Sequence, residues 1–148
     1  MPTEYILAYH CAPAFAGIKP SNIASCSKRE NPNITVQIKM LNEKLNKNDI
    51  YIDVLCECGE RVLLMVYRKQ KLCEYLQRDD IKSFLCDNGY PKEFSLIKYL
   101  AILKSRIYAQ RLMNKEFPHE IGAFLGYPLH DIYGFINHKH QGCLLTGE

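Results

Sequence analysis

The sequence predicts an α+β fold, in which a small, mainly antiparallel sheet of three to four strands is covered by six to seven helices. Three observations support this prediction. Two β-branched runs flank a short turn that contains Gly59, several segments repeat apolar residues at helical spacing, and prolines and glycines separate these segments. The 148 residues fit one domain, long enough to bury a core without disulfide or metal support.

The composition is that of an ordinary globular domain. Hydrophobic residues make up 47% and charged residues 24% of the chain, which argues against disordered, collagen-like and coiled-coil classes. A net charge of +3 is too small to indicate a nucleic-acid or membrane partner by itself. We expect a cytoplasmic protein, because no basic leader and no membrane-length apolar run occur. Seven cysteines in such a chain are more typical of thiols than of disulfides.

The N-terminal segment is predicted to bring a thiol to the end of a strand. Tyr5 to Tyr9 is apolar on both faces and is expected to be a covered strand, which delivers His10 and Cys11 at its end. Pro20 is placed to begin a helix that runs to about Ser27 and carries Cys26.

A helix and a hairpin are predicted next. Asn33 caps a helix whose apolar residues recur at helical spacing. These residues are Ile34, Ile38, Leu41 and Leu45. Ile50 to Glu57 and Arg61 to Arg68 form an antiparallel pair around Gly59. The second run is apolar without alternation, which predicts an interior strand.

The C-terminal half is predicted to be mainly helical. Lys69 to Gln77 and Asp79 to Asn88 are two short helices, and Gly89 stops the second. Phe94 to Asn114 is the longest helix. Its expected core-facing residues are Phe94, Ile97, Leu100, Ala101, Ile107, Tyr108 and Leu112. Cys143 to Thr146 is a candidate final strand.

The stretch from Phe117 to Ile136 is predicted to be a helix-turn-helix corner. Phe117-Pro118 opens the first helix, Gly126 closes it, and Pro128 opens the second helix. Gly122 and Gly134 lie inside these helices at a cost of about 1 kcal/mol each relative to alanine. Either a neighbouring helix or a ligand is therefore expected to approach them closely.

Several motifs together resemble a bacterial family catalogued as domain of unknown function 3793. They are His10-Cys11-Ala12-Pro13, Cys26, Val66-Tyr67-Arg68, Phe117-Pro118-His119-Glu120-Ile121-Gly122 and Phe124-Leu125-Gly126-Tyr127-Pro128. The resemblance spans nearly the whole chain and implies no particular reaction. Members usually continue into a segment that contains tryptophan, whereas this chain has none and ends at Glu148, which is compatible with a C-terminal truncation.

The leading functional hypothesis is a thiol-dependent enzyme or redox protein that acts on a small ligand. Cys11 is the candidate nucleophile and His10 or His119 its base, because backbone amides where a strand passes into a helix lower a thiol pKa. The site would lie between the His10-Cys11 loop and the first helix of the corner. Its expected ligand-binding residues are Cys26, Phe117, Glu120, Gly122 and Tyr127. The structural alternative is that Cys11 and Cys26 are simply buried small hydrophobes.

The rival hypothesis is a non-enzymatic interaction module that binds protein or nucleic acid through the helix-turn-helix. Nucleic acid is the less favoured partner, because the second helix has no arginine and carries Asp131 in its first turn. Two groups of potential metal ligands occur, and neither is predicted to hold a metal. They are Cys56 with Cys58, and His138 with His140 and Cys143. Neither a cofactor nor an oligomeric state follows from the sequence.

Overall fold

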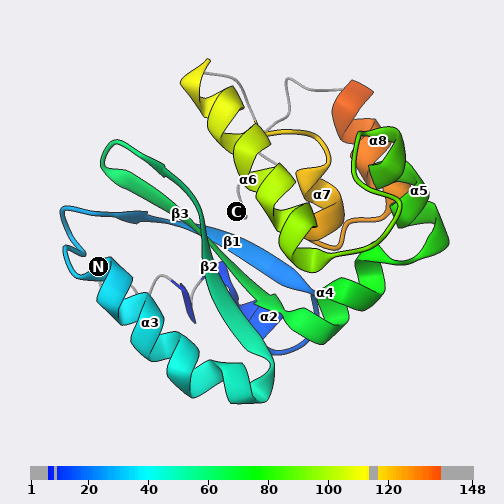
Figure 1. Cartoon of the computed structure of the whole chain (residues 1–148). Helices are drawn as coiled ribbons and strands as arrows, with labels where there is room; N and C mark the ends of the chain where they lie inside the picture. The colour runs from blue at the N-terminus through cyan, green and yellow to red at the C-terminus, as the bar shows by residue number, and fades with distance from the viewer. Residues whose placement is uncertain (1–6, 9, 114–116, 138–148) are drawn as a thin grey trace.

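The computed structural model describes residues 7, 8, 10–113 and 117–137, with side chains up to residue 134. Within these ranges the chain has seven α-helices, one 3-10 helix and three strands (Figure 1). In chain order they are α2 (Ala12–Phe15), β1 (Ser21–Ser27), α3 (Ile34–Leu45), η1 (Asn46–Asn48), β2 (Ile50–Cys58), β3 (Arg61–Arg68), α4 (Lys69–Leu76), α5 (Asp79–Asp87), α6 (Leu96–Leu112), α7 (Ile121–Phe124) and α8 (Leu129–Asn137). The fold is α+β, as predicted.

β3 is the central strand of a three-stranded antiparallel sheet with the order β1-β3-β2. β2 and β3 form the predicted hairpin, and its turn holds Gly59 at a φ of +60°, which glycine adopts without strain. The residues from Val62 to Tyr67 are all buried, because neighbouring strands cover both edges of β3 and helices cover both faces. The prediction that this strand is interior is confirmed.

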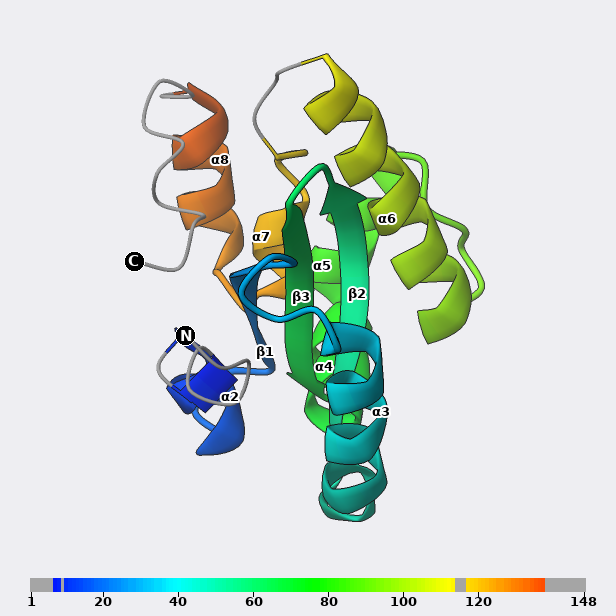
Figure 2. The same ribbon diagram turned by 90° about the vertical axis from the view of Figure 1, so that its left-hand side faces the viewer.

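The sheet separates two apolar cores. Successive side chains of a strand point to opposite faces, so alternate residues of β3 enter different cores. Val62, Leu64 and Val66 pack with residues of α2 and α3, whereas Leu63, Met65 and Tyr67 pack with residues of α4 to α8. Figure 2 shows α3 in front of the sheet and α4 and α5 behind it. Whether two side chains can meet therefore depends first on the face to which each belongs.

The predicted strand from Tyr5 to Tyr9 is wrong where it can be compared. Leu7 and Ala8 are helical, and the N–H of Cys11 donates to the carbonyl of Leu7 at 2.8 Å, which is a helical turn. Residues 1–6 and Tyr9 lie outside the described ranges. An apolar run of this length fits a buried helical turn as well as a buried strand, and periodicity cannot separate the two.

The predicted helix from Pro20 to Ser27 is also wrong, because Ser21–Ser27 is strand β1. Pro20 stands before the strand, and its carbonyl accepts the N–H of Arg68 at 2.9 Å. Serine and asparagine have little intrinsic preference for a helix interior. The antiparallel pairing with β3, which joins Ser21 to Tyr67 and Ser27 to Arg61, decides the conformation.

The helices α3, α4 and α5 agree with the prediction within one or two residues at each end. Asn33 is the N-cap of α3, and Ile34 and Ile38 are its buried residues. Gly89 follows α5 with a φ of +95°, so a glycine ends this helix as expected.

The longest helix was predicted correctly but with a partly wrong core face. Its N-cap Ser95 accepts from the N–H of Lys98, so α6 begins two residues after Phe94. Its buried residues are Tyr99, Leu100, Leu103 and Ile107. Four residues that were expected in the core are instead exposed: Ile97, Ala101, Tyr108 and Leu112.

None of the helices in the described part of the chain combines the length and the apolar character needed to cross a bilayer.

Candidate functional site

Cys11, the predicted nucleophile, is fully buried. It is the N-cap residue of α2 and belongs to the core beneath α2 and α3, together with Cys26 of β1. The pKa of the Cys11 thiol is raised to about 12, chiefly by burial and also by Cys26, against the opposing effect of Lys19. Such a thiol carries its proton at neutral pH, which is the reverse of an activated nucleophile. His10, the nearer of the two predicted bases, precedes it in the chain and is half-buried.

His119, the other predicted base, lies on the far side of the sheet. Its Nε2 is 2.8 Å from Oδ1 of Asn88, and its ring packs edge-on against Phe84 of α5. Because Nδ2 of Asn88 donates to the carbonyl of Phe84, Oδ1 of Asn88 is left to accept from Nε2–H of His119. Phe84 belongs to the core beneath α4 to α8, whereas Cys11 belongs to the opposite core. The structure therefore does not bring Cys11 and His119 together.

Glu120 is the centre of a buried polar cluster instead of a group that projects toward a ligand. It is 2% exposed, and its Oε2 accepts from Nη1 of Arg106 at 2.6 Å and from the hydroxyl of Tyr90 at 3.0 Å. The Arg106 guanidinium also lies over the Tyr90 ring. Burial, followed by the charge of Glu120, raises the pKa of Tyr90, so its hydroxyl remains a donor. The cluster ties the start of α7 to α6 and to the loop after α5.

Neither the partners of Glu120, Tyr90 and Arg106, nor the partner of His119, Asn88, could be recognised from the sequence. Arg106 comes 14 positions and Tyr90 30 positions before Glu120. No local motif connects residues at such separations, and an arginine on a long helix ordinarily indicates a solvated face. Only the composition of the segment, with its conspicuous Pro118-His119-Glu120, pointed to this part of the chain.

The segment from Phe117 to Asn137 forms a packing corner with a short first helix. α7 has four residues, all of them buried, and begins at Ile121 instead of after Pro118. A Cβ added to Gly122 would lie 3.0 Å from Cγ1 of Ile132, so this glycine lets α7 contact α8 closely. Gly134 has open space around it. Of the two alternatives for Gly122, close approach of a helix is the one observed.

The turn between α7 and α8 contacts the start of β1. Gly126 has a φ of +86°, and a Cβ there would lie 2.6 Å from Cδ of Pro20. The carbonyl of Tyr127 accepts the hydroxyl of Tyr75 at 2.6 Å. Phe117 is half-buried beneath the guanidinium of Arg111. The predicted ligand-binding residues Phe117, Gly122 and Tyr127 thus have identified packing partners.

The two groups of potential metal ligands differ in how far the structure describes them. Cys56 is buried and Cys58 is exposed at the end of β2. His138, His140 and Cys143, like the candidate strand from Cys143 to Thr146, lie outside the described residues. In the described ranges, no three His, Cys, Asp or Glu side chains are grouped so that they could hold a metal ion.

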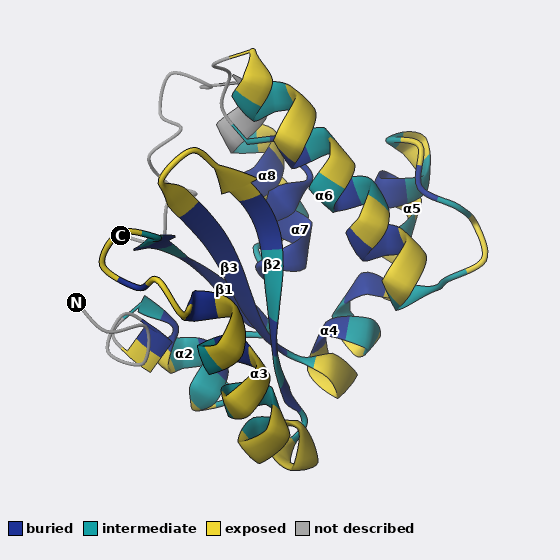
Figure 3. Ribbon diagram, turned by 60° about the vertical axis from the view of Figure 1, so that its left-hand side comes forward, coloured by how far each residue is buried: buried dark blue, intermediate teal, exposed yellow. Residues whose placement is uncertain are grey.

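The outer face of α6 carries a row of exposed apolar residues that the core does not need. Ile97, Ala101, Tyr108 and Leu112 stand at i, i+4, i+11 and i+15, which places them on one side of the helix. Ile97 is 83% exposed and Leu112 is 66% exposed. We call these four residues the α6 stripe, and Figure 3 shows exposed residues along this side of α6. Ile97 with Ala101 and Tyr108 with Leu112 form two exposed apolar pairs on this side, with Lys104 and Ser105 between them. Exposed apolar surface rimmed by polar residues marks a candidate interaction site.

Comparison with known proteins gives a family without an assigned activity. A family described as "Protein of unknown function (DUF3793)" matches residues 7–148. No curated protein and no solved structure matches the chain significantly.

Proposed function

Because the chain belongs to a family of proteins of unknown function, DUF3793, no relative supplies an activity, and we propose from its geometry that it is a protein-interaction module. The observation that carries the proposal is the α6 stripe. It is an apolar surface on a helix whose opposite face is anchored by Tyr99, Leu103 and Ile107, all 0% exposed. A surface held rigid in this way loses little conformational freedom on binding, which favours affinity.

The charges of α6 indicate what kind of partner fits. The helix contains Lys98, Lys104, Arg106 and Arg111 and no acidic residue. Lys104 and Arg106 are paired within the molecule, with Asp53 and Glu120. Two copies meeting through this face would place basic side chains against each other. We therefore propose that the partner is a different protein with an acidic amphipathic segment, whose apolar side covers the stripe.

The thiol hypothesis has less support from the geometry. It needs a reactive Cys11 next to a base, whereas the thiol is buried and His119 is on the other face of the sheet. The helix-turn-helix is a weaker candidate for the binding element than α6, because α7 is buried throughout.

Site-specific photocrosslinking in cells of the source organism tests the proposal. A photoreactive phenylalanine analogue replaces Tyr108 in the stripe, and a matched control places it at Val36, which is 57% exposed on α3. We expect a defined heterologous adduct from position 108 that is absent from position 36. Leu112→Asp in the same chain should reduce that adduct about tenfold or more, because it puts an acid where the partner is apolar and acidic.

Two outcomes would overturn the proposal. One is an identical adduct pattern from positions 36 and 108. The other is an adduct at 108 that survives Leu112→Asp unchanged. Sedimentation of the purified chain adds a third such outcome, since a dimer that is disrupted by Leu112→Asp would assign the stripe to self-association and overturn the proposal of a different partner protein.

A further inference from the structure

A groove separate from the α6 stripe lies between the segment that follows α2 and the helix α4. Its volume is about 300 Å³, at the lower end of the range for small-molecule sites. It is lined by Ile18, Pro20, Lys71, Glu74, Tyr75 and Arg78. Four of these residues come from α4 and the two positions after it: Lys71, Glu74, Tyr75 and Arg78. They are three or four positions apart, so they lie on one side of the helix.

One wall of the groove is apolar and fixed in position. The hydroxyl of Tyr75 donates to the carbonyl of Tyr127, which holds the aromatic ring. The Pro20 ring packs closely against Gly126, because a Cβ added to Gly126 would lie 2.6 Å from Cδ of Pro20. Ile18 adds exposed aliphatic surface at the rim. These groups form a preorganised apolar surface, which costs little to bring into contact with a ligand.

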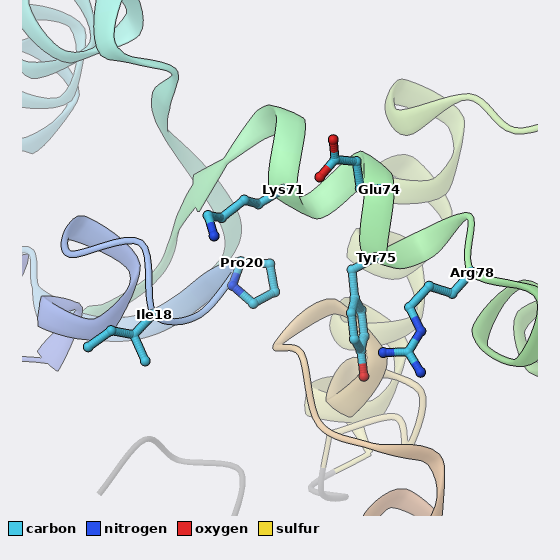
Figure 4. Close-up of a pocket in the computed structure, with 6 residues that line it drawn as sticks. All are labelled: Ile18, Pro20, Lys71, Glu74, Tyr75 and Arg78. Carbon is cyan, nitrogen blue, oxygen red and sulfur yellow. The ribbon is translucent and has the colours of Figure 1, made fainter.

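The other groups that line the groove are mainly cationic. Figure 4 shows the Lys71 ammonium directed toward Pro20 and the Arg78 guanidinium beside the Tyr75 ring, while the Glu74 carboxylate points away. No carboxylate in the described ranges forms an ion pair with Lys71. Among the described residues, Arg78 forms an exposed ion pair with Asp80 at 3.4 Å and lies over the Tyr75 ring. Two cations therefore face the apolar wall, and the acids nearest to it, Glu74, Asp80 and Asp131, are exposed to solvent.

Two further cations lie next to the groove. They are Arg68 and Lys19. A Cβ added to Gly17 would lie 3.5 Å from Nε of Arg68 and 3.7 Å from Cε of Lys71, so the Arg68 and Lys71 side chains meet beside Gly17. Arg68 uses its donors on the carbonyls of Ala14 and Phe15, not on a carboxylate. Nζ of Lys19 lies 4.7 Å from the centroid of the Tyr127 ring. This local excess of positive charge attracts anions.

We propose that this groove binds a small organic anion, a carboxylate or phosphate attached to an apolar or aromatic group. The anionic group pairs with the Lys71 ammonium beside Pro20, and the apolar group lies on Pro20 and Tyr75. Inorganic phosphate alone leaves the apolar wall unused, and a neutral aromatic compound leaves the Lys71 ammonium unused. The groove lies beside Gly126 and Tyr127, where sequence analysis placed a small-ligand site, but different side chains line it.

Titration of the full chain with three probes, followed by amide NMR shifts, tests the inference. The first probe is phenyl phosphate, which carries both an anionic group and an aromatic ring. The second is inorganic phosphate, which carries the charge without the ring, and the third is phenol, which carries the ring without the charge. Phenyl phosphate should give saturable shifts at the amides of Ile18 and of residues 71–78, with an affinity about tenfold or more above that of either other probe. Lys71→Glu should weaken phenyl phosphate binding about tenfold, whereas Lys39→Glu on α3 should leave it unchanged.

Lys71 and Lys39 are both exposed, so both variants should keep the wild-type circular dichroism spectrum. Equal affinities for phenyl phosphate and inorganic phosphate would overturn the inference, because they would indicate diffuse charge attraction only. Shifts located elsewhere on the chain, or an affinity unaffected by Lys71→Glu, would overturn it as well. None of these outcomes depends on the α6 stripe.

Discussion

Replacing Gly126 by alanine measures how tightly the turn before α8 is packed against the start of β1. Gly126 has a φ of +86°, and the added Cβ would lie 2.6 Å from Cδ and 2.8 Å from Cγ of Pro20. A left-handed conformation costs an L-residue about 1–2 kcal/mol. Overpacking against a ring that cannot rotate away costs about 1–3 kcal/mol more. We therefore expect Gly126→Ala to lower the free energy of unfolding by about 2–5 kcal/mol.

Two other glycines separate these contributions. Gly59 has a φ of +60°, but no atom lies within 4 Å of an added Cβ, so Gly59→Ala should cost only the conformational part, about 1–2 kcal/mol. Gly134 lies inside α8 with open space around it. Gly134→Ala should therefore stabilise the chain by about 1 kcal/mol through helix propensity.

Urea unfolding of the three variants, followed by circular dichroism, gives the comparison, provided that the slope with denaturant stays constant. The expected order of stability is Gly134→Ala, wild type, Gly59→Ala and Gly126→Ala. If Gly126→Ala costs no more than Gly59→Ala, the contact with Pro20 is not tight. Pro20 would then not be held in the wall of the groove by Gly126.

Three further predictions concern the cysteine, the polar cluster and α6. The pKa of the Cys11 thiol is about 12 in the folded chain, above that of a free thiol. Its contribution to the free energy of unfolding is therefore fully present below about pH 8.5. It is lost as the pH rises toward 12, by up to about 1.4 kcal/mol per pH unit. Cys11→Ala should accordingly show a shallower alkaline loss of stability in urea titrations at pH 8 to 10, and an equal slope would contradict the buried thiol. Arg106→Ala leaves the Glu120 carboxylate, among the described residues, with the Tyr90 hydroxyl as its one side-chain partner. It should cost about 2–3 kcal/mol, less than for a fully buried pair because Arg106 is partly exposed. A double-mutant cycle with Glu120→Gln should give a coupling of at least about 0.5 kcal/mol, and strict additivity would refute the pairing. Leu112→Asp should lower the free energy of unfolding by about 1 kcal/mol, because aspartate is a weaker helix former and is unfavourable at a helix C-terminus. Leu103→Ala should cost about 2–5 kcal/mol. Similar losses from the two would mean that the assignment of the α6 faces is wrong.

The elements predicted correctly are those whose signal is local. The helical spacing in α3 and the glycine at the β2–β3 turn are each contained in a short window. β3 was recognised as interior because its own residues are apolar without alternation. β1 was missed because its small polar residues become a strand only by pairing with β3, which follows much later in the chain.

The core face of α6 was predicted only in part for a different reason. The helix has apolar residues on two sides, and Ile97 and Leu103 look equally suited to a core. Only the packing of the whole molecule shows that Leu103 is 0% exposed and Ile97 is 83% exposed. The residues that confused the prediction are the ones that now form the α6 stripe.

The candidate site depended on tertiary information that spacing does not contain. Whether Cys11 can reach His119 depends on which face of the sheet each packs against, and they pack on opposite faces. The groove shows the same limit. Lys71 and Arg78 belong to a segment predicted as helix and the position after it, but Ile18 and Pro20 join them only after the chain folds.

The strand order β1-β3-β2 also affects how the sheet assembles. The β2–β3 hairpin closes through a tight turn. β1 and β3 are instead separated in the chain by α3 and β2, so their pairing closes a much longer loop. Closing the longer loop costs more chain entropy, so we expect the hairpin to form first and β1 to dock late. β1 and α2 should then be the first part to open in the native state, seen as faster amide hydrogen exchange than in β3. Because Cys11 and Cys26 are buried beneath these elements, we expect a thiol reagent to label them only at the rate at which β1 and α2 open.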